Sequence, residues 1–285
     1  AGSEYAQNYT TCFLQDGDAF VLRTEFLIQI LEGIHKYLPN IKHVTTYARA
    51  DSIARKSVSE LRELKAAGIE HLYCGMETGS DLILRKINKG FDAATIIIGG
   101  TKAKEAGMVL SEFTLFGIGG KELAEENAVE TAKVLNVIKP DFIRVHATGI
   151  KLSSEMWNYV KNKELTLQSE EEIVSEQKIM LELLADDMDC IYMNEHIVNL
   201  LLEVRGNIRT DKQNMLETIN TYLQLPKQEQ ELFNLGRRLN IMFFLADLNN
   251  RAKRKQTEEG LRKIKAQNPD LDLAFVCNYV RQTQI

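Results

Sequence analysis

Strand-like and helix-like segments alternate along this chain at intervals of roughly 30 to 45 residues, which is the spacing of βα units. Only the architecture recurs, because no stretch of the sequence repeats. In such an arrangement the strands run parallel and their carboxyl ends meet at one edge of the sheet. The pattern predicts an α/β protein with a barrel-like sheet. The strands are expected at residues 11–14, 41–48, 69–76, 109–116, 141–147 and 189–193.

Strand signals fade after Leu200, and helical patterns dominate the remainder. We therefore predict a barrel over residues 1–200 and a mostly helical extension over residues 201–285. Residues 1–9 have the pattern of a helix end, so the chain is expected to begin in the middle of a βα unit. The C-terminal helices are expected at residues 211–223, 227–249 and 257–266, with an apolar tail at 271–280.

Composition narrows the class of protein. The 285 residues are 44% hydrophobic and 26% charged, which is enough apolar material for a large core. A net charge of −5 argues against a nucleic-acid-binding function, and the basic run at residues 251–255 is typical of a solvated helix face. No segment has about 18 uninterrupted apolar residues, and no signal pattern begins the chain, so we expect a cytoplasmic protein with no membrane partner.

The cysteines give no sign of a metal site. Cys12, Cys74, Cys190 and Cys277 are far apart and form no C-x-x-C pair, so this chain alone is not expected to hold zinc or an iron–sulfur cluster. We assign no metal ligand. Most of these residues lie in apolar runs, which is typical of small buried thiols in a reducing cytoplasm.

Polar and glycine residues follow the predicted strands, at the ends that meet in the mouth of a parallel barrel. Together they are a stronger signal than any one of them, because Asp-Gly by itself is also a common turn dipeptide. The residues at these ends are Asp16, Gly17, Asp18, Arg49, Glu77, Thr78, Gly117, Ile118, Gly119, Gly120, His146, Asn194, Glu195 and His196.

Each of these groups also has an ordinary structural interpretation. Gly117 to Gly120 could let a ligand approach the backbone, or could form only a tight turn, and the segment lacks a full phosphate-loop pattern. Glu77 could accept hydrogen bonds from a ribose diol or an amine, or could cap the next helix. His146 and His196 could transfer protons, or could be structural. Lys151 could form a Schiff base, as one lysine among many.

The segments at these positions resemble the radical S-adenosylmethionine (SAM) superfamily, in the branch of coproporphyrinogen oxidase-like and uncharacterised iron–sulfur oxidoreductases. The resemblance covers about residues 5 to 210. Its carrying segments are Phe-Leu-Gln-Asp-Gly-Asp-Ala (13–19), Gly-Met-Glu-Thr-Gly-Ser-Asp (75–81), Ile-Asn-Lys-Gly (87–90), Lys-Ala-Lys-Glu-Ala-Gly (102–107) and Phe-Gly-Ile-Gly-Gly (116–120).

The resemblance implies a partial (β/α)6 TIM-type barrel that holds SAM and a four-iron four-sulfur cluster at its mouth. It implies that Asp16, Gly17 and Asp18 receive the SAM amino group, and that Glu77 and Thr78 contact the ribose and methionyl parts. Gly117, Ile118 and Gly119 would lie against adenine. Arg49, His146, Asn194 and His196, with Asn199, are candidates for the substrate side.

One part of the family pattern is absent. The sequence has no C-x3-C-x2-C motif to ligate the cluster, and the first barrel strand is missing as well. We expect that the motif belongs to a segment outside this chain. The chain by itself would then be inactive.

Three functions are compatible with the sequence. The first is a radical SAM enzyme, reduced by flavodoxin or ferredoxin, that acts on an unknown small-molecule or peptide substrate. The second is a cluster-less barrel that binds SAM or a nucleotide as a regulatory or scaffold module. The third is an unrelated barrel lyase that uses Lys151 or the acidic strand ends.

Overall fold

The computed structural model describes residues 8–15, 17–267 and 270–284 of the chain. Its strands form one mostly parallel sheet, in the order β1-β2-β3-β4-β5-β6-β7. This confirms the predicted fold, a partial TIM-type barrel with a helical C-terminal part. The strands are β1 (Thr11–Leu14), β2 (His43–Ala48), β3 (Ile69–Glu77), β4 (Val109–Phe116), β5 (Phe142–Ala147), β6 (Ile191–Met193) and β7 (Gly206–Asn207).

The chain divides into two compact units. The first consists of Ala1–Thr114 with Val134–Ile143, and the second of Leu115–Lys133 with Arg144–Ile285. The division predicted at residue 200 follows secondary structure rather than compactness, and it stays a prediction. None of the helices in the described part of the chain combines the length and the apolar character needed to cross a bilayer.

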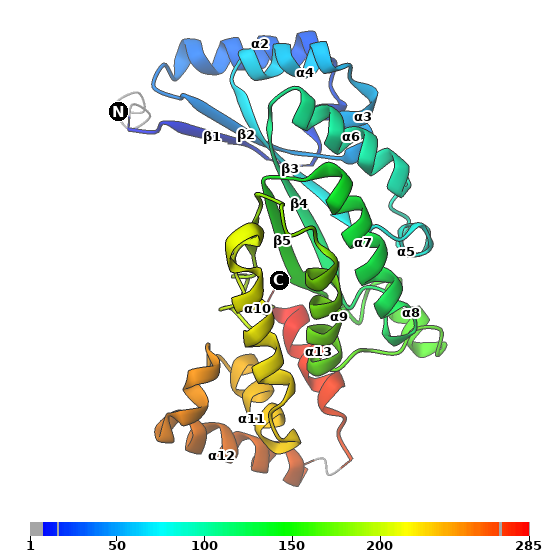
Figure 1. Ribbon diagram of the computed structural model, residues 1–285, viewed down its shortest axis with the longest axis vertical. Helices are drawn as coiled ribbons and strands as arrows, with labels where there is room; N and C mark the ends of the chain where they lie inside the picture. Colours follow the sequence, from blue (N-terminus) through cyan, green and yellow to red (C-terminus); the bar gives the residue numbers. More distant parts are fainter. Residues whose placement is uncertain (1–7, 16, 268–269, 285) are drawn as a thin grey trace. The chain divides into compact units, whose positions relative to one another are not determined.

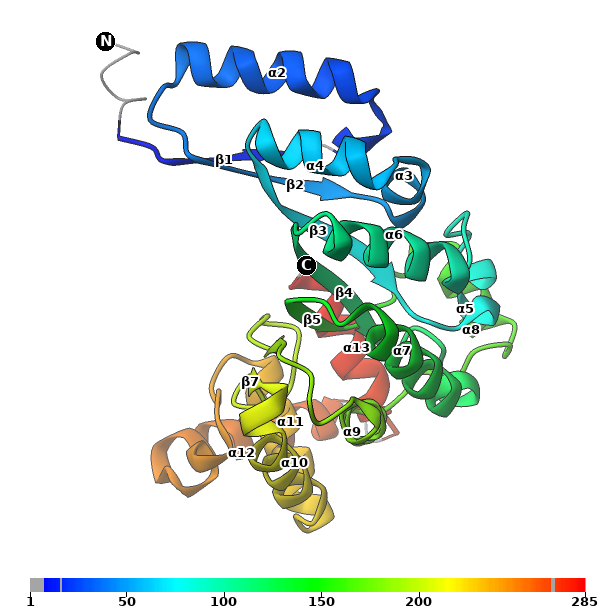
Figure 2. The ribbon, with the colours of Figure 1, turned by 45° about the horizontal axis from the view of Figure 1, so that its top comes forward.

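In the first unit, β1 to β4 pair in parallel, so their carboxyl ends share one edge. Helices α2, α3, α4 and α6 lie along one face of these strands, as Figures 1 and 2 show. The helices of this unit are α2 (Thr24–Tyr37), α3 (Ala50–Arg55), α4 (Val58–Ala66), α5 (Asp81–Lys86) and α6 (Ala93–Glu105), with the short 3-10 turn η1 (Ala19–Val21).

The side chains of these strands alternate between two different environments. Val44, Leu72 and Leu110 are fully buried. Positions of the opposite parity carry an aromatic row, in which the ring centroid of Tyr73 lies 5.3 Å from that of Phe13 and 6.1 Å from that of Tyr47. Tyr47 is 43% exposed, so this row forms the more open face of the sheet.

Local capping signals in the first unit are confirmed with one exception. Ser57 caps α4 and forms the predicted capping box with Glu60. Ser80 and Asp92 cap α5 and α6. A threonine at the start of a helical pattern predicts that Thr24 is the N-cap of α2, and this prediction is wrong. Arg23 is the N-cap, and the Thr24 hydroxyl donates to Glu60 Oε1 at 2.9 Å. The Thr24 hydroxyl therefore bonds to a distant side chain, that of Glu60, and not to a backbone amide of its own helix.

The second unit is mostly helical, and its strands β6 and β7 pair antiparallel. A single helix was expected over residues 227–249, but α11 ends at Arg238. The chain turns there because Asn240 adopts a left-handed φ of 57°. The helices are η2 (Lys121–Leu123), α7 (Ala124–Ile138), which spans both units, α8 (Met156–Lys161), α9 (Glu170–Leu183), α10 (Ile208–Leu223), α11 (Lys227–Arg238), η3 (Leu245–Asn249), α12 (Arg251–Gln267) and α13 (Leu273–Thr283).

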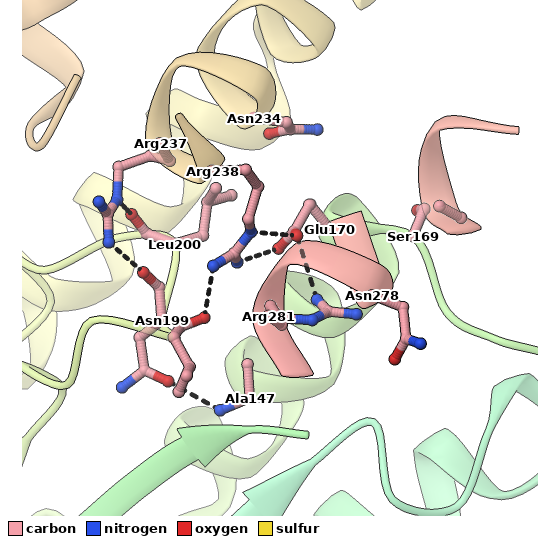
Figure 3. A network of polar contacts seen from close by, with 12 residues as sticks. Ala147, Ser169, Glu170, Asn199, Leu200, Asn234, Arg237, Arg238, Asn278 and Arg281 are labelled. Atoms are coloured by element: carbon pink, nitrogen blue, oxygen red, sulfur yellow. Dashed lines mark hydrogen bonds and ion pairs between the residues drawn. The ribbon is translucent and has the colours of Figure 1, made fainter. Parts of the chain in front are cut away.

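A buried ion cluster joins three of these helices (Figure 3). Glu170 at the start of α9 accepts two hydrogen bonds of 2.8 Å from Arg238 of α11, and its Oε1 lies 3.1 Å from Nη1 of Arg281 in α13. Burial opposes ionisation of Glu170, but the two guanidinium charges outweigh it and lower the pKa of the carboxyl to about 2. The cluster is therefore charged at neutral pH.

Replacement of Glu170 by Gln should destabilise the second unit strongly, because it leaves two buried guanidinium groups without a counter-charge. We expect the free energy of unfolding to fall by about 3–5 kcal/mol. Urea denaturation followed by the fluorescence of Trp157, in the same unit, measures this. The control is Glu182→Gln, which removes an exposed partner of Lys178 and should change the free energy by less than about 0.5 kcal/mol. Equal losses in the two variants would contradict the prediction.

Candidate functional site

The first group of predicted site residues lies where β1 ends. Asp16 is outside the described residues, and Gly17 has a left-handed φ of 103°. The Asp18 carboxylate accepts hydrogen bonds from the Phe20 amide at 3.1 Å and from the Arg49 amide at 3.2 Å, and also from the Ser52 hydroxyl. Asp18 therefore ties the end of β1 to the start of α3, which follows β2.

Glu77 ends β3 on an irregularity of the strand. The β3–β4 register shifts between Gly75 and Glu77, and Glu77 adopts a left-handed φ of 65°, a conformation that is uncommon outside glycine. A Cβ at position 75 would collide with Glu77 Oε1, so Gly75 gives this carboxylate its room. Thr78 is fully buried, and its hydroxyl accepts a hydrogen bond from the Ser80 amide at 3.0 Å.

Lys89 joins the separate strand ends in the first unit. Its ammonium lies 2.8 Å from Glu77 Oε1, and its carbonyl accepts a 2.9 Å hydrogen bond from Arg49 Nη2. Both cations lie over the ring of Phe91, at 5.0 Å for Arg49 and 5.6 Å for Lys89. The structure thus brings Asp18, Arg49 and Glu77 together. We did not single out Lys89 as a site residue, although it stands in the Ile-Asn-Lys-Gly segment that carries the family resemblance.

A second carboxyl group lies close enough to influence this cluster electrostatically. Glu112 of β4 is 1% exposed and is paired across the strands with Cys74. The Cys74 thiol, a weak donor, lies against this carboxylate, which otherwise has no hydrogen-bond partner in the described part of the chain. Burial raises the pKa of Glu112 to about 8, with a smaller contribution from the charge of Glu77. Glu112 is therefore mostly protonated at neutral pH.

This raised pKa makes the stability of the first unit depend on pH. Glu112 ionises near pH 4.5 in the unfolded chain and near pH 8 in the folded chain. Its contribution to the free energy of unfolding is therefore fully present below pH 4.5 and is lost as pH rises through 8. We expect wild type to lose on the order of 4 kcal/mol between pH 4.5 and pH 9 from this group, and Glu112→Gln to lose less. Urea denaturation at several pH values measures it. The control, exposed Glu63→Gln, should keep the wild-type decline; a Glu112→Gln curve that declines equally would refute the prediction.

The glycine turn after β4 belongs to the second unit, and a buried carboxylate fixes its backbone. Gly117 has a left-handed φ of 83°, and its amide donates to Glu176 Oε2 at 3.0 Å. The carboxylate of Glu176 also accepts from Asn127 Nδ2 at 2.5 Å and from Gln168 Nε2 at 2.8 Å. Ile118 is 6% exposed and Gly119 is buried, so the turn is packed rather than loose.

Glu176 was missed by the sequence analysis, because it lies in a helical pattern 59 positions from Gly117. It is fully buried without a cation, and burial raises its pKa to about 7 in spite of its three donors. The one sequence feature that could have pointed to Glu176 is an acidic residue on the otherwise apolar face of a helix. Its position makes it the residue that fixes the backbone of the glycine turn.

The remaining candidates also lie in the second unit. The rings of His146 and His196 are 4.3 Å apart. Burial lowers the pKa of both, that of His146 to about 4, with help from the charges of His196 and Arg144, so both rings are neutral at pH 7. The amide of Asn194 donates to the Leu201 carbonyl at 2.6 Å. Asn199 holds the end of β5 through the Ala147 amide and the Val145 carbonyl, both at 2.7 Å. Their roles toward a substrate stay predictions.

Fold and motifs together define the class of protein: the chain has the fold of the radical SAM superfamily, and the resemblance to its HemN-like branch is confirmed. Among curated proteins it is similar to the heme chaperone HemW of Bacillus subtilis (strain 168), with 23% identity over 173 residues, 60% of this chain and 45% of that protein. Among solved structures it is similar to coproporphyrinogen III oxidase (HemN) from Escherichia coli, described as a radical SAM enzyme. That match has a TM-score of 0.50 and 15% identity, over 61% of this chain and 40% of that one.

These comparisons have a limited extent. The chain spans less than half the length of each of these two proteins. No protein-family model matches it. The comparisons therefore show the fold and support the resemblance, and the activity of the whole protein is a matter for proposal.

Proposed function

We propose that this chain carries the SAM-binding part of a radical SAM enzyme. The whole protein would cleave SAM reductively at a four-iron four-sulfur cluster and use the resulting 5′-deoxyadenosyl radical on its substrate. The observation that carries the proposal is the joining of Asp18, Arg49 and Glu77 through Lys89 at the carboxyl ends of β1 to β3. Ligands of α/β sheets bind at this edge.

The groups gathered at this edge match the polar parts of SAM. Asp18 and Glu77 offer carboxylate oxygens to the ammonium group and the ribose diol. Arg49, a substrate-side candidate in the sequence, pairs with Asp51 at 3.0 Å and in this proposal offers its guanidinium to the SAM carboxylate instead. In this proposal Lys89 gives up Glu77 when the SAM ammonium binds.

The cluster does not fit the residues of this chain. The described residues contain no group of three or more His, Cys, Asp or Glu that could hold a metal ion. The four cysteines are free and distant in sequence, and three of them are buried. The proposal therefore requires ligands outside this sequence, and the chain alone should bind SAM without cleaving it. In the whole protein flavodoxin or ferredoxin would deliver the electron, which also favours a cytoplasmic location.

The same observation favours a second function. A barrel without cluster ligands could bind SAM or a nucleotide as a regulatory or scaffold module. It would share the binding residues with the enzyme, but it would have no reductive chemistry. Lys151, the residue of the lyase hypothesis, is exposed in the loop after β5, and no described contact prepares it for Schiff-base formation.

Removal of the Asp18 charge should weaken SAM binding by this chain, because a charge-assisted hydrogen bond to the ligand ammonium is lost. We expect Asp18→Asn to raise the Kd for SAM about tenfold or more, as measured by isothermal titration calorimetry. Asn can keep accepting from the Phe20 and Arg49 amides, so the fold is preserved. The control, Glu63→Gln, should leave the Kd unchanged. An unchanged Kd in Asp18→Asn would show that this residue does not meet SAM.

The two functions differ in what the whole protein does with SAM. If the full-length protein with its cluster reconstituted is an enzyme, it should release 5′-deoxyadenosine on addition of dithionite, detected by liquid chromatography. A loaded cluster that gives no 5′-deoxyadenosine, or a full-length gene with no C-x3-C-x2-C motif, would exclude the enzyme and leave the binding module.

A further inference from the structure

The second unit contains a cavity of about 830 Å³ that none of the functions above uses. It lies among the α8–α9 connection, α11, the end of α12 and the start of α13. Its size is in the range of small-molecule sites, which are mostly apolar with a few polar groups. The apolar wall consists of Trp157, Val160, Leu165, Leu235, Leu273 and Phe275.

Two aromatic rings define one side of this cavity. Trp157 on α8 and Phe275 on α13 have ring centroids 6.1 Å apart, with their planes tilted by 54°. Trp157 is only partly buried, so part of its ring faces the cavity. Tilted aromatic surfaces of this kind add a further aromatic ring favourably, by edge-to-face or offset contact.

Four lysines line the cavity: Lys121, Lys163, Lys227 and Lys265. Three of them form ion pairs: Lys121 with Glu172 at 2.7 Å, Lys227 with Glu171 at 3.0 Å, and Lys265 with Glu231 at 3.4 Å. Lys163 is exposed, and its ammonium has no ion pair or hydrogen bond within the described part of the chain. Its backbone adopts a left-handed φ of 62°, an uncommon conformation for lysine, which fixes its position after α8.

Most acidic groups of the wall already have cationic partners. Glu171 and Glu231 pair with Lys227 and Lys265, and the carboxylate of Glu170 is taken by Arg238 and Arg281, two cations for one anion. Asp272 is exposed and accepts a hydrogen bond from the Ala274 amide at the start of α13, which leaves its charge in place. A ligand that enters the cavity therefore meets aromatic surface, the unpaired ammonium of Lys163 and one carboxylate, that of Asp272.

We propose that this cavity binds an amphipathic organic anion, an aromatic carboxylate, with its ring against Trp157 and Phe275 and its carboxylate at Lys163. The site is distinct from the proposed SAM site, because none of the residues that line it belongs to the predicted SAM set. The ligand class follows from the wall: the rings select an aromatic body, and Lys163 selects a negative charge.

The chain contains a single tryptophan, Trp157, so its fluorescence reports on this cavity directly. The probes are 2-naphthoate and the uncharged 2-naphthalenemethanol, which have the same ring system. We expect 2-naphthoate to change the emission of Trp157 saturably, and the alcohol to bind roughly threefold to fivefold more weakly, as for the loss of one exposed ion pair. No saturable change with 2-naphthoate, or equal affinity for both probes, would overturn the proposal.

Variants of the exposed lysines locate the charge. Lys163→Asn removes the ammonium with a residue that tolerates a left-handed φ, and it should lower 2-naphthoate affinity to that of the alcohol. Lys163→Arg should keep the preference for the anion. The matched control is Lys161→Asn, an exposed lysine at the end of α8 that does not line the cavity, and it should behave like wild type. If Lys161→Asn and Lys163→Asn lose the preference equally, the anion binds the general surface charge and the assigned site is wrong.

Discussion

The helical second unit depends on one buried carboxylate, that of Glu170. Two guanidinium groups from distant helices, Arg238 and Arg281, satisfy it, and neither could remain buried without it. Hydrophobic contact alone would allow α9, α11 and α13 to slide along one another. The two hydrogen bonds from Arg238 and the ion pair with Arg281 favour a single arrangement of these helices. The positions of these helices also determine the shape of the cavity beside Trp157.

In the first unit, the polar residues at the strand ends make hydrogen bonds and ion pairs with one another. Asp18 holds the start of α3, Glu77 is paired with Lys89, and Arg49 is fixed on Phe91. Their geometry is therefore set before any ligand arrives, which reduces the entropy lost on binding. The neutral Glu112 behind them matters for the same reason, because a second negative charge there would disturb the pair between Glu77 and Lys89.

Sequence predicted what depends on near neighbours and failed where distant residues decide. The capping box of Ser57 and Glu60 is a local motif, and so are the strand ends that carry Asp18 and Glu77. Lys89 and Glu176 become important only when the fold brings them to Glu77 and Gly117, and no local pattern encodes that meeting. The helix expected to continue to residue 249 ends at Arg238, because apolar periodicity does not show that Asn240 turns left-handed. The cofactor and its binding residues come from the motif resemblance and not from spacing, and they stay predictions.

The ion cluster of Glu170 also has a consequence for how the chain is made. Glu170 and Arg238 are synthesised well before Arg281, whose helix α13 is the last one described. Until α13 is made, Glu170 and Arg238 can form a one-to-one pair, but the helix that brings the second cation to this buried centre is absent. The core of the second unit is therefore completed only after synthesis of α13, and a chain released earlier would leave its centre uncovered.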